Sequence, residues 1–139
     1  MTFKNINTFK KNLENKLTSK AHGNAKAAVQ RSTILVQTSI AAGGTGETVQ
    51  KYNPTRTHTQ SKPLSPPATD TGFLVSQITM DVSSKADGSV VGQIISSAPY
   101  SKPLEFGTVN MQPRPFMQPA LQKNKQKIVS IFKYEGVIR

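Results

Sequence analysis

The chain has 139 residues, no cysteine and a formal net charge of +11. This length predicts one domain that can bury a core without disulfides, and the lack of cysteine excludes thiolate nucleophiles and cysteine-bound metals. The charge predicts attraction to polyanions such as nucleic acids, because the excess is large for so short a chain; the alternative is a basic surface with no specific partner. No segment has the apolar length of a membrane span and the N-terminus lacks the apolar centre of a secretory signal, so we expect a protein made in a cytoplasm-like compartment.

Residues 5–40 are expected to form an amphipathic helix. Apolar or small side chains recur there at intervals of three or four residues: Ile6, Phe9, Leu13, Leu17, Ala21, Ala25, Ala28, Ser32, Val36 and Ile40. The lysines fall largely off this stripe, so the simplest interpretation is a core helix whose lysines are solvated.

Residues 41–70 are expected to form a long extended loop. Three glycines and four prolines disfavour regular structure there, and a connection of this length is usually functional or disordered. Tyr52 and Arg56 give the loop more side-chain chemistry than a spacer needs, which suggests an arm that lies on a neighbouring subunit. His58 has no second His or Cys at ligand spacing, so we expect no metal site.

Residues 73–98 are expected to form a β-hairpin. Apolar residues alternate along two segments, with Leu74, Ile78, Met80 and Val82 on the first and Val90, Val91, Ile94 and Ile95 on the second. Asp87-Gly88 between them is a favoured two-residue turn. Two strands alone are marginally stable, so helices are expected to cover them.

Pro99–Ala120 is rich in rigid residues: PYSKPLEFGTVNMQPRPFMQPA. We expect its aromatic side chains to be packed, with a short helix from Tyr100 to Phe106, a stop at Gly107 and an extended crossing. Prolines then open a last helix, which has an apolar face and a stop at Gly136. That face consists of Phe116, Ala120, Leu121, Ile128, Ile131 and Phe132.

Together these elements predict an α+β fold in a single domain, residues 1–139. It has a long N-terminal helix, an antiparallel β-hairpin or small sheet, and a C-terminal helix packed on the sheet, with the extended loop 41–70 between them.

No set of catalytic residues is recognisable in the sequence. The seven acids form no evident pair for acid–base work, no nucleophile elbow is present, and the early glycines precede no phosphate-binding lysine. We therefore expect no enzymatic activity and no cofactor. Glu105 is the acid of most interest: it either pairs with Arg114 across the extended crossing or lies exposed on the short helix.

Two blocks of residues resemble a phage family. The first block is Tyr100, Glu105-Phe106-Gly107-Thr108, Arg114-Pro115-Phe116 and Pro119-Ala120; the second is Pro66, Pro67, Asp70, Thr71, Gly72, Leu74 and Ile78. In this order, between two basic helices, they are similar to the head–tail joining or tail-completion proteins of lambda-like long-tailed phages, the gene-product-ten family. Phe73, Val75 and Gln77 depart from that pattern, in which basic or polar residues are common.

The resemblance implies a non-enzymatic structural protein of the virion that forms a homo-oligomeric ring at the head–tail junction, or neck. Such a ring would join the head connector or stopper to the tail terminator or tail tube around the DNA channel, without a membrane. Six copies would match a six-fold tail, and twelve a portal-like ring. The protein would be made in the cytoplasm of the bacterial host.

Three sets of residues are candidates for these contacts. A rigid motif without catalytic groups is better explained by docking, which gives Tyr100, Leu104, Glu105, Phe106, Gly107, Thr108 and Arg114. Tyr52 and Arg56 are candidates for an inter-subunit arm. The candidates for the DNA channel are Lys10, Lys11, Lys16, Lys20, Lys123 and Lys127.

Two alternatives remain open. One is a free basic protein that binds nucleic acid, although the stacking aromatics and the reading helix of such proteins are not recognisable. The other is a neighbouring ring of the neck, such as the tail terminator or the stopper.

Overall fold

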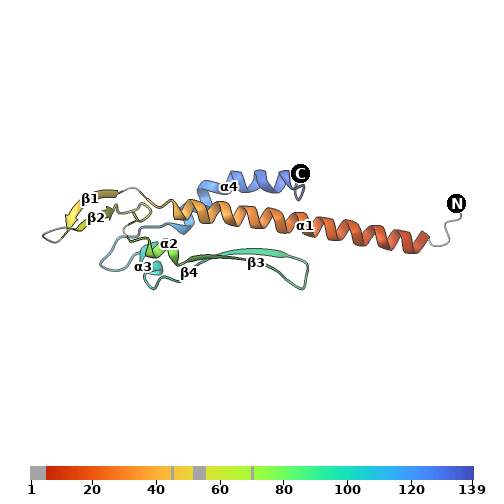
Figure 1. Cartoon of the computed structure of the whole chain (residues 1–139), viewed down its shortest axis with the longest axis horizontal. Helices are drawn as coiled ribbons and strands as arrows, with labels where there is room; N and C mark the ends of the chain where they lie inside the picture. The colour runs from red at the N-terminus through yellow and green to blue at the C-terminus, as the bar shows by residue number, and fades with distance from the viewer. Residues whose placement is uncertain (1–5, 45, 52–55, 70) are drawn as a thin grey trace.

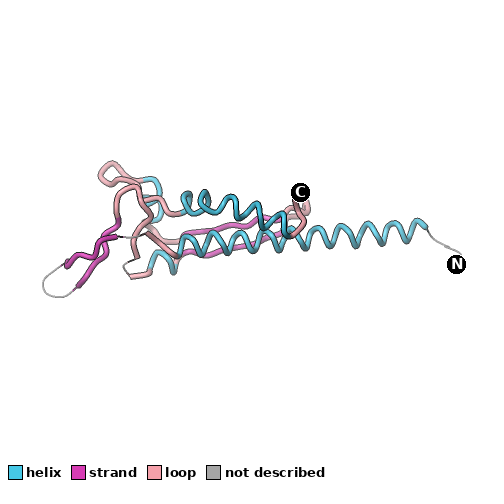
Figure 2. The backbone as a smooth tube through the Cα atoms, turned by 90° about the horizontal axis from the view of Figure 1, so that it is seen from above, coloured by secondary structure: helices cyan, strands magenta, loops and turns pink. Residues whose placement is uncertain are grey.

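The computed structural model describes the whole chain except residues 1–5, 45, 52–55 and 70. Its longest element is helix α1 (Ile6–Ala41), which confirms the predicted N-terminal helix. With 36 residues it spans about 54 Å. Its N-terminal part projects beyond every other element, as Figures 1 and 2 show.

The predicted antiparallel hairpin is confirmed as strands β3 (Ile78–Ser84) and β4 (Val90–Ser96). Ile78 lies opposite Ser96 at one end of the pair, and Ser84 lies opposite Val90 at the other. It begins later than expected, because Phe73–Ser76 form a single helical turn, α2, after Gly72 at φ 76°. The first strand was therefore predicted too long at its start.

The connection between β3 and β4 differs from the predicted two-residue turn. The Lys85 N–H donates to the Ser89 carbonyl oxygen at 2.8 Å, which leaves a three-residue loop that ends in Gly88 at φ 83°. A three-residue hairpin loop needs a left-handed residue in this position. The amide and hydroxyl of Ser89 both donate to the Asp87 carboxylate, and these hydrogen bonds lower the pKa of Asp87.

Residues 41–70 are not the unbroken extended loop that we predicted. They contain strands β1 (Gly46–Lys51) and β2 (Arg56–Ser61), which pair antiparallel. Gly46 lies opposite Ser61, and Lys51 lies opposite Arg56. The prolines all fall outside these strands, and threonine and valine, which favour strands, are frequent within them. The prediction of a loop relied on these prolines, but they lie only in the segments between and after the strands.

The last two helices are α3 (Ser101–Phe106) and α4 (Met117–Tyr134), close to the predicted bounds. Gly136, at φ 69°, ends α4 in a Schellman motif, in which the Val137 N–H donates to the Phe132 carbonyl and the Gly136 N–H to the Lys133 carbonyl. Among the described residues, no helix combines the length and apolar character that crossing a bilayer requires.

Helix α1 lies along the β3–β4 sheet, and α4 runs antiparallel beside α1, which completes the predicted α+β arrangement (Figure 1). The buried core cluster consists of Val36, Ile40, Ile78, Phe116 and Ala120. At the far end of α4, the Glu135 carboxylate pairs with Arg31 of α1, whose guanidinium lies 5.8 Å from the centre of the Tyr134 ring.

Gly92 allows α1 to approach the sheet closely. A Cβ atom at Gly92 would collide with the Thr33 hydroxyl and lie 2.8 Å from Val29 Cγ1. The absence of a side chain in the middle of β4 is therefore a packing requirement.

The apolar stripe of α1 is buried over only part of its predicted length. Ala28, Val36 and Ile40 are buried, whereas Phe9 is 61% and Leu17 60% exposed. Each four-residue interval advances the stripe by about 40° around the helix, because a turn contains 3.6 residues. The covering elements also end near His22, whose Nδ1 lies 3.2 Å from the Gly88 carbonyl oxygen at the tip of the hairpin.

Candidate functional site

The Glu105 carboxylate of α3 caps the N-terminus of α4. Its Oε2 accepts hydrogen bonds from the N–H groups of Phe116 (2.8 Å) and Met117 (3.0 Å), and its Oε1 accepts one from Gln118 (2.9 Å). The first N–H groups of a helix have no partner within the helix, and they carry the positive end of its dipole. A carboxylate supplied by another element therefore fixes where α4 starts.

Arg114 does not pair with Glu105, so the proposed ion pair is wrong. The Arg114 N–H donates to the Leu104 carbonyl oxygen at 2.6 Å, and Arg114 Nε donates to the Ser61 carbonyl oxygen at 3.3 Å. Arg114 thus connects α3 to the end of β2. The alternative, an exposed Glu105, is also wrong, because this side chain is half-buried against α4.

Gly107 ends α3 and begins the connection to α4. It has φ 76° and ψ 179°, and a Cβ atom there would lie 2.8 Å from the Met111 carbonyl oxygen and 3.0 Å from Pro113. The Thr108 N–H donates to that same Met111 oxygen at 2.8 Å. Only glycine adopts this conformation without strain.

These contacts join the segment around Glu105 to the segment around Arg114, and we call the resulting unit the α3–α4 joint; its residues are Leu104, Glu105, Gly107, Arg114 and Phe116. Phe116 belongs to the core cluster and is 3% exposed, as predicted, and Leu104 is a partly buried residue that packs against that cluster. The joint therefore sets the position of α4 relative to α1 and the sheet.

The remaining docking candidates face outward. Phe106 is 77% and Tyr100 39% exposed, contrary to the expectation that both are packed. The Tyr100 ring lies 6.0 Å from the Phe73 ring, and Thr108 is exposed. The predicted docking set thus divides into residues that build the joint and residues that remain free for contact.

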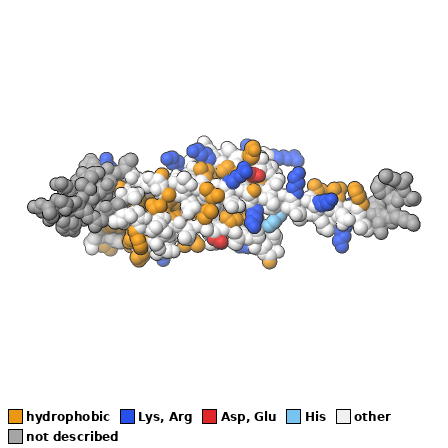
Figure 3. Space-filling view, in the orientation of Figure 1, with side chains coloured by type: hydrophobic (Ala, Val, Ile, Leu, Met, Phe, Trp, Pro, Cys, Tyr) orange, Lys and Arg blue, Asp and Glu red, His pale blue; other side chains and the backbone are white. Residues whose placement is uncertain are grey.

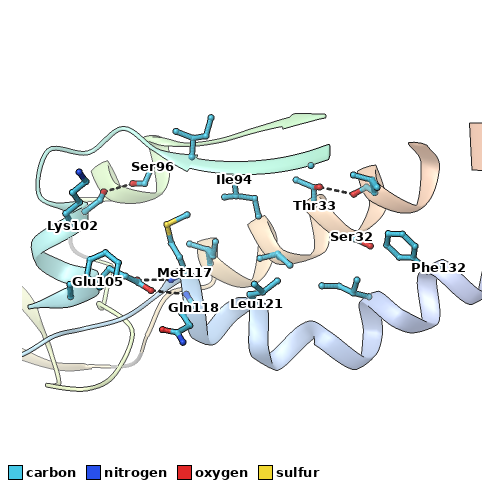
Figure 4. Close-up of a pocket in the computed structure, with 18 residues that line it drawn as sticks. Ser32, Thr33, Ile94, Ser96, Lys102, Glu105, Met117, Gln118, Leu121 and Phe132 are labelled. Atoms are coloured by element: carbon cyan, nitrogen blue, oxygen red, sulfur yellow. Dashed lines mark hydrogen bonds between the residues drawn. The ribbon is translucent and has the colours of Figure 1, made fainter. Parts of the chain in front are cut away.

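A groove of about 800 Å³ lies between helices α1, α3 and α4 and strand β4 (Figure 4). Apolar side chains form most of its wall: Val36, Ile94, Phe106, Met117, Leu121, Ile128 and Phe132. Leu121, predicted to belong to the core face of α4, is 51% exposed here and lines the groove.

Polar groups lie at two places along the groove. Ser96, Ser101, Lys102 and Glu105 stand at the α3 end, where the hydroxyls of Ser96 and Ser101 share a hydrogen bond. Near Phe132, the Ser32 hydroxyl is buried, and within the described part of the chain it has no hydrogen-bond partner. Buried polar groups are usually paired.

The lysine candidates are exposed and lie on two elements. Lys10, Lys11, Lys16 and Lys20 stand on the projecting part of α1, and Lys123 and Lys127 stand on α4. Figure 3 shows Lys and Arg side chains spread over one face, with few acidic groups among them.

The arm candidates are not tested by the geometry. Tyr52 lies outside the described residues, and Arg56 begins β2 with a side chain that is likewise not described. The β1–β2 hairpin itself projects at the end of the molecule opposite to the N-terminus of α1 (Figure 2).

No family model, no curated protein and no solved structure matches this chain. Over the described residues, no group of three or more His, Asp or Glu side chains could hold a metal ion. The site is therefore defined by its geometry: a rigid joint, an apolar groove and a projecting helix. The sequence analysis missed the groove, although a glycine in the middle of β4 was a signal of close helix–strand packing.

Proposed function

We propose that this protein is a structural component of a phage virion, in which copies of the chain form a ring at the head–tail junction. The ring joins the head connector or stopper to the tail terminator or tail tube and surrounds the path of the DNA. The protein acts by contact and carries out no reaction.

The α3–α4 joint carries this proposal. Two motifs of the first block on which the family resemblance rests, one around Glu105 and one around Arg114, are brought into direct contact by four hydrogen bonds, three to the Glu105 carboxylate and one from the Arg114 N–H. These two motifs are separate in the sequence, but both serve to hold the start of α4 against α3. That supports a common fold as the origin of the resemblance.

Exposed groups supply the contacts that the function needs. Tyr100, at 39% exposure and outside the groove, is placed to dock on a neighbouring neck protein. The projecting lysines attract passing DNA without reading its sequence, and the β1–β2 hairpin serves as the inter-subunit arm.

Deletion of the gene in the phage or prophage that encodes it tests the proposal. We expect filled heads and complete tails to accumulate separately in electron micrographs, because only their joining is lost. Expression of the wild-type protein in the host restores joined virions, whereas Tyr100→Ser, which alters an exposed docking residue outside the groove, restores fewer. Normal joined virions without the protein would refute the proposal.

The free nucleic-acid-binding alternative predicts a different outcome from the same deletion. DNA replication or packaging would then fall, and heads would be empty or few. Micrographs of the deletion lysate therefore separate the two functions directly.

A further inference from the structure

We propose that the projecting part of α1, residues 8–20 of one copy, lies in the apolar groove of a second copy. This inference rests on the ring proposed above and names the two surfaces through which its subunits meet.

The projecting part of α1 has an apolar stripe with nothing to cover it. Phe9 (61% exposed), Leu13 (47%) and Leu17 (60%) follow one another at four-residue intervals, so they are neighbours on the helix surface. Every residue from 8 to 20 is exposed. A helix gains most of its stability in a protein from packing of its apolar face, so a partner that covers the stripe would stabilise this segment.

The stripe cannot reach the groove of its own chain. The wall that α1 contributes to the groove runs from Val29 to Ile40, and the helix is continuous from Ile6 to Ala41. Phe9 therefore lies about 30 Å from Val29 along the same straight axis. Figures 1 and 2 show the projecting end directed away from the rest of the fold.

The groove matches the projecting part in length and in chemistry. Its α4 wall extends from Met117 to Phe132, about 22 Å, and residues 8–20 span about 18 Å. An apolar helix face that lies in an apolar groove is a recurrent mode of peptide recognition.

The buried Ser32 hydroxyl is a second, independent sign of an occupant. It lines the groove and has no partner within the described residues. Buried polar groups are usually paired.

The two surfaces differ, so the contact is head-to-tail. Each copy offers one stripe and one groove, and repetition of such a contact closes into a ring when the rotation permits it. Each copy carries a charge of +11, so copies repel, and salt that screens this repulsion strengthens the contact.

Cross-linking between copies tests the inference, since a chain without cysteine accepts single labels. Leu13→Cys protein is mixed with Leu121→Cys protein and treated with a short bismaleimide. We expect peptides that join positions 13 and 121 at a yield about tenfold above a control mixture of Leu13→Cys with Val109→Cys. Val109 is fully exposed and lies outside the groove.

A matched pair of charge substitutions completes the test. Leu13→Glu adds a negative charge on the stripe, and Asn15→Glu adds the same charge about 200° around the helix, away from the stripe. We expect Leu13→Glu to raise the concentration needed for self-association at least about tenfold by sedimentation, and Asn15→Glu to change it little. Equal effects of the two substitutions, or equal yields from the two cross-linking mixtures, would overturn the inference.

These outcomes are distinct from failure of the proposed function. Cross-links from 13 to 121 together with normal virions from the deletion strain would leave the contact standing and remove the neck role. Separate heads and tails without such cross-links would keep the neck role and disprove this contact.

Discussion

At the scale of single residues, Glu105 is the most informative side chain in the molecule. Its carboxylate accepts three N–H groups at the start of α4, a position where Phe116 offers no polar side chain of its own. Charge-assisted hydrogen bonds of this kind are stronger than neutral ones, and the positive end of the helix dipole adds to them.

Glu105→Ala is expected to reduce the free energy of unfolding by about 2 kcal/mol, because helix N–H groups lose their partner. Glu105→Gln keeps an acceptor oxygen and is expected to lose roughly half as much. Urea denaturation measures both. Glu14→Ala, on an exposed turn of α1, is the control; equal stability of Glu105→Ala and Glu14→Ala would show that the cap contributes nothing.

Alanine substitutions at two glycines are expected to change the free energy of unfolding in opposite directions. Gly107→Ala forces a side chain into a left-handed φ and against the Met111 carbonyl, so we expect a loss of about 1–3 kcal/mol. Gly23→Ala, in an open helical position, is expected to gain about 0.5–1 kcal/mol. Thermal unfolding reports both; stabilisation by Gly107→Ala would contradict the geometry of the joint.

The sequence indicated that Glu105 matters but could not identify its partners. Charged side chains suggest charged partners, and Arg114 was the candidate because the extended crossing could fold back to Glu105. The true partners are backbone N–H groups, which every residue type shares and no sequence pattern marks. The stop at Gly107 was predictable, because glycine tolerates the required φ.

At the scale of elements, α1 is one helix with two environments. Its existence and bounds followed from helical spacing, but the stripe was wrongly expected to be buried throughout. Periodicity shows that a face is apolar and does not show how far the covering elements extend. Here the hairpin tip ends at His22, and the helix continues.

Hydrogen exchange tests this division. In dilute monomer, we expect backbone amides of residues 8–20 to exchange at least about tenfold faster than those of residues 28–40, because no packing opposes local opening of the projecting part. At concentrations where copies associate, the difference is expected to shrink. Uniform exchange along α1 in the monomer would contradict it.

At the scale of the whole molecule, the high net charge gives the two proposed interactions, DNA binding and self-association, opposite dependences on salt concentration. Lysine contacts to phosphate weaken as salt rises, because the release of each condensed counterion into a more concentrated salt solution gains less entropy. The proposed contact between copies is apolar and strengthens as salt screens repulsion. Composition alone predicted the first behaviour, whereas the second required the positions of the groove and the stripe.

DNA binding is expected to be weak, independent of sequence and steeply reduced by salt. Lys16→Gln with Lys20→Gln is expected to lower the slope of log affinity against log salt by about one to two, and Lys62→Gln with Lys85→Gln, at equal net charge, by less. Fluorescence anisotropy with two unrelated duplexes measures this. Preference for one duplex, or binding that persists at high salt, would favour a free nucleic-acid-binding protein.

Native mass spectrometry of the purified protein tests the central claim, self-assembly into a closed ring, most directly. We predict one dominant assembly at six or twelve times the chain mass of 15.1 kDa, which dissociates when Leu13→Glu is introduced. A chain that stays monomeric at every concentration, or an open-ended series of masses without a preferred size, would contradict the account.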